Sequence, residues 1–183
     1  MITISENQLK QAVDYITGLD EKGVTGFFDD FSRKQPVLLA YATAMSEQLK
    51  GADDRETLFY YASVLWKAFQ YPEIDLKKIP ENKLMEFEKS IENFYKKMAG
   101  VPDSILNSPE ASLFKSQPVL MAYLFNELAG DIVGSDGSGS GSEPGNPAPQ
   151  MDDNRGITFF VLFVLLHCLN EALNGPRLEV VPK

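Results

Sequence analysis

The sequence contains very little of the chemistry from which disulfides, metal sites and many catalytic centres are built. Among its 183 residues there is one cysteine, Cys168, and one histidine, His167. A single cysteine cannot form an intramolecular disulfide, and a zinc site with only these two side chains would need carboxylates for its remaining ligands. We therefore expect no disulfide, no metal and no cofactor.

The two residues that could supply a nucleophile and a base are neighbours in the sequence, and this argues against a catalytic pair. Adjacent residues on a helix point about 100° apart, so the thiol of Cys168 and the imidazole of His167 would not meet. No glycine-rich phosphate loop with a following Lys-Ser or Lys-Thr occurs, and no Glu-x-x-His pair predicts a di-iron site. The sequence favours a non-catalytic protein, and the enzyme alternative stays open.

Basic residues are too few and too scattered to form a nucleic-acid interface. The net charge is −9, with 13 acidic and 9 basic residues in 1–82 and 13 acidic and 8 basic residues in 83–183. Because nucleic-acid binding requires Lys and Arg clustered against phosphates, we expect no nucleic-acid partner. An acidic surface suits a basic protein partner, although the same balance also serves solubility.

Neither a secretory signal nor a long membrane span is predicted. The N-terminal residues, MITISENQLK, lack a basic segment followed by an apolar one, and with the single cysteine this predicts a cytoplasmic protein. The one strongly apolar run is ITFFVLFVLLHCL at 157–169. As a helix it reaches only about 20 Å, short of the length that crosses a bilayer. We expect a helix buried on all sides, with a membrane-surface role as the minor alternative.

What the sequence does contain is a repeat. QPVLLAY at 35–41 returns as QPVLMAY at 117–123, and at the same offset of 82 Leu9 falls on Ile91. RETLFYYASVLWKAF at 55–69 resembles RGITFFVLFVLLHCL at 155–169, but at an offset of 100. A stretch rich in Gly, Ser and Pro at 134–150 accounts for the difference, and we interpret it as a flexible loop between two helices. The pattern predicts an internal duplication.

The apolar spacing predicts an all-α protein of two tandem three-helix units, packed as one compact pseudo-twofold helical domain. The expected helices are 5–18, 35–50 and 54–70, then 83–99, 117–130 and 154–173. The segments 19–34 and 101–116 are expected to add no more than a short helical turn each. The predicted units span 1–72 and 83–174, with a connector at 73–82 and a tail at 175–183.

Equivalent residues of the two units supply candidate ligand-binding side chains. A proline follows Gln35 and Gln117, which places each glutamine at the start of a helix, because proline suits the first helical position. The alternative is that the two glutamines line a shared groove. Tyr41 and Tyr123 can pack their rings while their hydroxyls find partners at the edge of the core.

Arg55 and Arg155 form the third candidate pair. Each follows aspartates, in DDR and DDNR, and is expected to open the third helix of its unit. A cation at a helix N-terminus is unfavourable with respect to the helix dipole, so each arginine should have a specific acceptor. The neighbouring aspartates are the simplest acceptors, and an anion bound by the arginine is the sharper alternative.

These features predict an intracellular helical protein that acts by protein–protein interaction. Its partner would be another protein or a second copy of the chain, in an inhibitor, immunity-like or scaffold role. The alternative is a small-molecule or anion site, or an enzyme, with a pocket between the two halves near Arg55, Arg155, Tyr41 and Tyr123.

Overall fold

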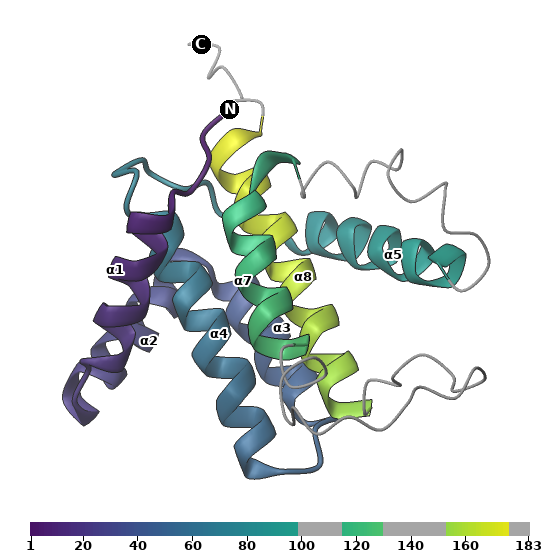
Figure 1. Ribbon diagram of the computed structural model, residues 1–183, viewed down its shortest axis with the longest axis horizontal. Coiled ribbons are helices and arrows are strands. Elements are labelled where there is room, and N and C mark those ends of the chain that lie inside the picture. Colours follow the sequence, from purple (N-terminus) through teal and green to yellow (C-terminus); the bar gives the residue numbers. More distant parts are fainter. Residues whose placement is uncertain (99–114, 130–152, 176–183) are drawn as a thin grey trace, which may run out of the picture.

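The computed structural model of the protein describes residues 1–98, 115–129 and 153–175 (Figure 1). This part of the chain contains seven α-helices and no β-strand, so the predicted all-α class is confirmed. The helices are α1 (Glu6–Thr17), α2 (Glu21–Lys34), α3 (Pro36–Ser46), α4 (Ala52–Gln70), α5 (Glu81–Met98), α7 (Pro118–Ala129) and α8 (Asp153–Asn174). The predicted loop at 134–150 and most of the predicted tail lie outside the described residues.

Local sequence signals explain where the first helices begin and end. Ser5 and Gln8 form a capping box at the start of α1, in which the Gln8 side chain accepts a hydrogen bond from the Ser5 amide at 2.9 Å. Asp20 caps α2 by accepting a hydrogen bond from the Gly23 amide at 2.7 Å. Pro36 ends α2 and starts α3, because it cannot continue the first helix but suits the first turn of the second.

Two expectations for the N-terminal half are wrong. The segment 19–34 contains the 14-residue helix Glu21–Lys34, not a short turn, so this half contains four helices instead of three. Phe27 and Phe31, one turn apart on α2, are both buried, and this burial outweighs the low helix propensity of two glycines. Helix α3 ends at Ser46 and not near 50, because the next three amides bond three residues back in a tighter turn that buries Leu49.

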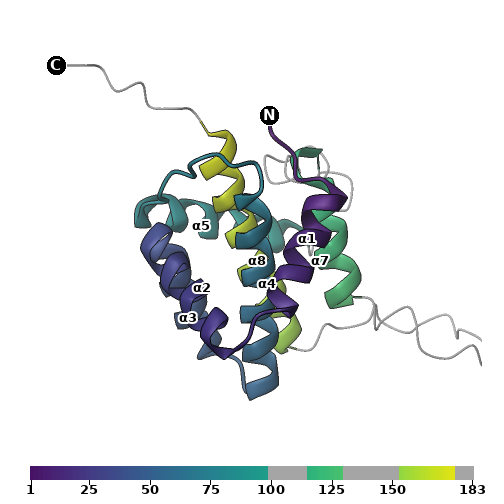
Figure 2. The same cartoon turned by 90° about the vertical axis from the view of Figure 1, so that its left-hand side faces the viewer.

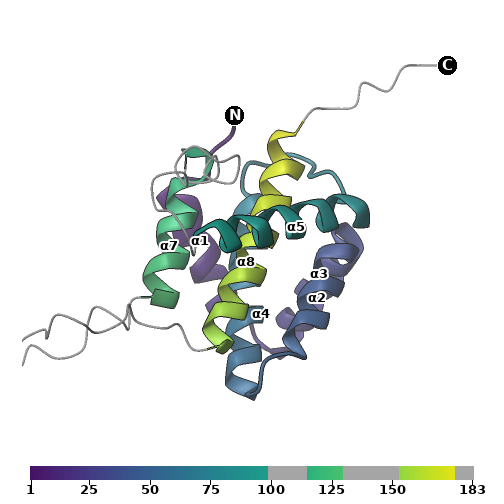
Figure 3. The ribbon, with the colours of Figure 1, turned by 90° about the vertical axis from the view of Figure 1, so that its right-hand side faces the viewer.

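The core lies between α4 and α8, the two helices with the most buried residues, which pack against each other at the centre of the molecule (Figures 2 and 3). Residues 61–66 of α4 and 161–166 of α8 are buried without interruption. In both views α2 and α3 lie on one flank of this pair, with α1 and α7 on the other. Helix α5 packs across α8. Helix α2 contacts α4 through the ring of Phe31, which stacks on Trp66 with 4.9 Å between centroids.

Replacing Gly26 with alanine should stabilise the protein. Gly26 lies inside α2 and is exposed, and a β-carbon there would meet nothing within 4 Å. Alanine favours the helix over glycine, so the free energy of unfolding should rise by about 0.5–1 kcal/mol. Urea unfolding followed by circular dichroism would measure it.

Gly23→Ala provides the matched control on the same helix. Its β-carbon would approach Leu19 at 3.0 Å and the capping oxygen of Asp20 at 3.1 Å. The gain should be smaller than for Gly26→Ala or become a loss. An equal gain at both sites would show that crowding at the start of α2 does not matter.

Candidate functional site

Gln35 is a buried side chain whose amide bonds to an extended backbone segment. It is 1% exposed, and its Nε2 donates to the carbonyl oxygen of Lys77 at 2.7 Å. Its Oε1 accepts a hydrogen bond from the amide of Ile79 at 3.0 Å. The side chain therefore pairs with alternate backbone groups of the segment before α5, as a neighbouring strand would.

Gln117 makes the same arrangement with the N-terminal segment that precedes α1. It is fully buried, its Oε1 accepts from the Ile4 amide at 2.9 Å, and its Nε2 donates to the Ile2 carbonyl at 3.0 Å. The same Nε2 also donates to Asn170 at 2.9 Å. We call these two arrangements the Gln35 clasp and the Gln117 clasp. They explain the burial of both glutamines without a ligand, since buried polar groups require partners.

Arg55 bonds to a backbone carbonyl and so fixes the loop between α3 and α4. Its Nε and Nη2 donate to the Leu49 oxygen at 3.2 and 3.1 Å. The adjacent Asp54 accepts a hydrogen bond from Asn154 at 2.6 Å, which joins the first turns of α4 and α8. Arg155 follows Asn154 in the first turn of α8 and is half-buried.

The two candidate tyrosines occupy different surroundings. Tyr41 donates a hydrogen bond to Glu88 on α5 at 3.2 Å, and its burial, together with this carboxylate, raises the pKa of the phenol. Tyr123 packs its ring edge-on against Tyr61 with 5.8 Å between centroids. Burial and the neighbouring Tyr60 raise the pKa of Tyr123 as well. Both phenols are therefore neutral near neutral pH.

The candidate arginines and tyrosines are distributed over separate places. Arg55 lines a groove formed by the C-terminal end of α1 and by α2, α3 and α4, which we call the α1–α4 groove. Tyr41 lines a second groove between α3 and α5, called the α3–α5 groove. Arg55 and Tyr41, which were expected near one pocket, thus line different grooves.

The α1–α4 groove has a volume of about 620 Å³ and is mainly apolar. Phe28 forms part of its wall and meets Phe27 edge-on at 5.7 Å and Phe59 at 6.0 Å between ring centroids. The few side chains with polar groups that line it are Thr43, Arg55, Glu56, Tyr60 and Ser63. Sequence reasoning missed this groove because three of the residues that line it, Val24, Phe27 and Phe28, come from α2, which was expected to be only a turn.

The α3–α5 groove has a volume of about 730 Å³ and a mixed character. Val37 and Met45 of α3 face Leu84 and Met85 of α5 across it. The charged side chains that line it are two acids, Glu81 and Glu88, and Met85 is 59% exposed. The groove therefore combines apolar walls with negative charge.

Helix α3 connects these two grooves through its outer surface. It carries no charged residue, and a shallow hollow along it shares Leu39 and Thr43 with the α1–α4 groove. The same hollow shares Pro36, Ala40 and Ala44 with the α3–α5 groove. We call these five residues the α3 face, and all except Leu39 are exposed.

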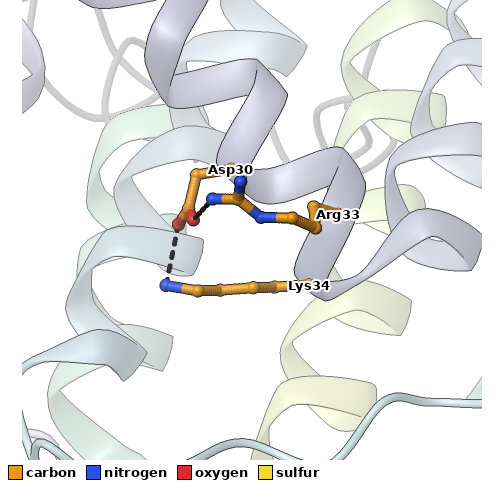
Figure 4. Close-up of polar contacts among 3 residues, drawn as sticks. All are labelled: Asp30, Arg33 and Lys34. Carbon is orange, nitrogen blue, oxygen red and sulfur yellow. Dashed lines mark hydrogen bonds and ion pairs between the residues drawn. The ribbon is translucent and has the colours of Figure 1, made fainter.

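A further hollow of about 490 Å³ lies at the C-terminal ends of α2 and α4, near the ion pairs of Asp30 (Figure 4). Asp30 bonds to Arg33 at 2.7 Å and to Lys34 at 2.9 Å. Burial opposes ionisation of Asp30, but the bonds from Lys34 and Arg33 outweigh it and lower its pKa. Lys34 also lines the hollow, as do Glu73 and Asp75. The positive and negative charges around the hollow therefore offset one another.

The cysteine and the histidine lie in the interior part of α8. Cys168 is fully buried, and burial, reinforced by the charge of Glu171, raises the pKa of its thiol to about 12. The His167 ring stacks on Phe87 with 4.9 Å between centroids. Within the described ranges, no three His, Cys, Asp or Glu side chains gather closely enough to hold a metal ion.

Comparisons with protein-family models, with curated protein sequences and with solved structures found no match. Among the described helices, α8 is the one whose length and composition would allow it to cross a membrane. Its most apolar window is 67% buried inside the molecule, as is typical of a core helix.

Replacing Gln117 with methionine should destabilise the protein strongly. The change keeps the side-chain volume but leaves the Ile4 amide without its hydrogen-bond partner and removes one of the two donors to Asn170. A buried unpaired amide is costly, so the free energy of unfolding should fall by about 1–3 kcal/mol. Gln35→Met should act similarly.

Gln48→Met is the control for this loss, because Gln48 is exposed and its side chain bonds only to the sulfur of Met45. It should change the free energy of unfolding by less than about 0.5 kcal/mol. Urea unfolding of the three variants gives the comparison. A loss below about 1 kcal/mol for Gln117→Met would show that the clasp is not a main support of the fold.

Cys168 should resist thiol reagents in the native protein. A thiol with a pKa of about 12 stays protonated at pH 8, and the thiolate is the reactive form. Labelling with Ellman's reagent at about pH 8 should be slow in buffer and rapid in denaturant, where the pKa returns to about 8.5. Rapid labelling without denaturant would contradict the burial of α8.

Proposed function

We propose that this is a cytoplasmic, non-catalytic binding protein that docks a basic, apolar segment of another protein on the α3 face and in the α3–α5 groove. The observation that carries the proposal is the uncharged, exposed surface of α3 beside a groove whose charged side chains are both acidic. Exposed apolar surface that continues into grooves is typical of interaction sites.

The side chains of the α3 face suit the close approach of a partner helix. Ala40 and Ala44 are one turn apart and exposed, so a partner backbone can come near α3. The neighbouring α3–α5 groove then offers room for a large apolar side chain of the partner between Met45 and Met85. Methionine side chains adapt readily to different apolar partners.

Charge favours a basic partner over a second copy of this chain. Glu81 and Glu88 both line the groove, and Tyr41 fixes one oxygen of Glu88 by a hydrogen bond. A second copy would bring the same carboxylates toward the interface and would carry the same net charge of −9. Like charges oppose the association of two copies, whereas a basic segment is attracted to the same carboxylates.

We also infer that the chain arose by internal duplication and has pseudo-twofold packing. The two clasps support this, because each glutamine of the repeated heptapeptide binds the segment that precedes the first helix of the other unit. Lys77 and Ile79 follow Ile2 and Ile4 by 75 positions, as Glu81 follows Glu6. The first helices would then correspond at an offset of 75 instead of 82.

A synthetic helical peptide of 14 residues, with leucines on one face and lysines on the other, should bind the protein. Fluorescence anisotropy would give its affinity, which should fall as salt is added. Glu81→Gln with Glu88→Gln should weaken binding about threefold to tenfold, because each exposed ion pair contributes modestly. Ala44→Arg should weaken it further by adding a bulky cation to the α3 face.

The control is Glu6→Gln with Glu21→Gln, which removes the same charge from the first turns of α1 and α2. It should leave peptide binding within about twofold of the original value. Equal losses in both double variants would reduce the effect to net charge and contradict the site. A stable dimer in light scattering that Ala44→Arg dissociates would replace the basic partner with a second copy.

A further inference from the structure

The α1–α4 groove differs from the α3–α5 groove in its walls and in its charge. Its sides are aromatic and aliphatic, with Phe28 between Phe27 and Phe59 in edge-on contacts. Val24, which lines the groove, is a large apolar residue of α2, yet 40% of its surface is exposed. A volume of about 620 Å³ lies within the range of small-molecule pockets.

A hydroxyl lies at one end of this groove. Ser63 is 4% exposed and lines the groove, and its hydroxyl can both donate and accept a hydrogen bond. Because it borders the cavity, this hydroxyl is placed to take a hydrogen-bonding partner there. A polar atom of a bound molecule would supply it.

A fixed cation lies at the other end. Arg55 precedes Ser63 by two turns of α4, which corresponds to about 12 Å along the helix. Its Nε and Nη2 are held by the Leu49 carbonyl, so the guanidinium keeps its place while Nη1 remains able to donate. Glu56 also lines this end; it is exposed, as Arg55 is, but without such a bond it can turn toward solvent.

We propose that the α1–α4 groove binds a small anionic amphiphile. Its carboxylate or sulfonate lies at Arg55, its apolar body lies against Phe28 and Phe59, and a polar atom reaches Ser63. The separation of the two polar ends along α4 sets the length of the body at about 10–12 Å, which is the size of two or three fused rings or of a medium alkyl chain.

Two fluorescent probes with the same apolar body separate the charge from the cavity. The anionic probe is 1-anilinonaphthalene-8-sulfonate, and the neutral one is N-phenyl-1-naphthylamine. The folded protein should bind one equivalent of each, and the anionic probe more tightly. Arg55→Met should weaken the anionic probe about tenfold, because a charged hydrogen bond is lost, and should leave the neutral probe unchanged. Glu56→Gln should strengthen only the anionic probe.

Further variants locate the site and exclude a general charge effect. Thr43 is exposed on the α3 side of the groove, so Thr43→Trp should fill it and abolish binding of both probes. Lys22→Met removes an exposed cation of α2 that does not line the groove, and it should change neither affinity. Saturating anionic probe should raise the melting temperature, since a ligand of the native state stabilises it.

Each contrary result has a definite meaning. Equal affinities for both probes, unaffected by Arg55→Met, would overturn the anionic head group. Binding that survives Thr43→Trp would place the site elsewhere. A melting temperature lowered by the probe would mean that it binds a partly unfolded state. The Arg55 and Glu56 variants leave the helical peptide test independent, because neither residue lines the α3–α5 groove or belongs to the α3 face, whereas Thr43 belongs to both sites.

Discussion

Two extended segments of this helical protein each bury one isoleucine, Ile4 or Ile79, without a β-sheet to pair their backbone, and the fold depends on supplying their hydrogen bonds. Buried backbone amides and carbonyls are costly when unpaired. Gln35 and Gln117 pair them by presenting a side-chain amide where a strand would present a peptide group. Each glutamine starts a helix that packs near the segment it binds, so the clasps link the entry of α1 to α7 and the entry of α5 to α3. The helices can then close around α4 and α8.

The central pair determines which surfaces remain for binding. Because α4 and α8 bury nearly all their middle residues, they offer little surface for recognition. The flanking helices are shorter and only partly covered, and they leave the α3 face and the two grooves open. The α3–α5 groove is acidic and suits a basic protein segment, whereas the α1–α4 groove is aromatic and has an arginine at one end. The two proposed occupants therefore differ in chemistry because α3 has different neighbours on its two sides.

The helices with strong apolar spacing were predictable to within a few residues, as for α4 and α8, because burial of one or all faces leaves a clear pattern. Helix α2 was not, since Gly23 and Gly26 lower its propensity and its two core residues, Phe27 and Phe31, occupy a single short stripe. The alignment of the first helices was ambiguous for a geometric reason. Offsets of 75 and 82 differ by seven residues, which is close to two helical turns, so both place apolar residues on the same face.

Composition and periodicity by themselves determined the helical class and the burial of the long apolar runs in α4 and α8, and they showed that a glutamine–proline pair recurs. They also indicated that Arg55 needs an acceptor, but not that this acceptor is the carbonyl of Leu49. Only the tertiary structure decided what each glutamine binds, that Arg55 and Tyr41 line different grooves, and that Ser63 faces a cavity. A sequence pattern records which side of a helix is buried, whereas the partner across an interface depends on where distant segments of the chain meet.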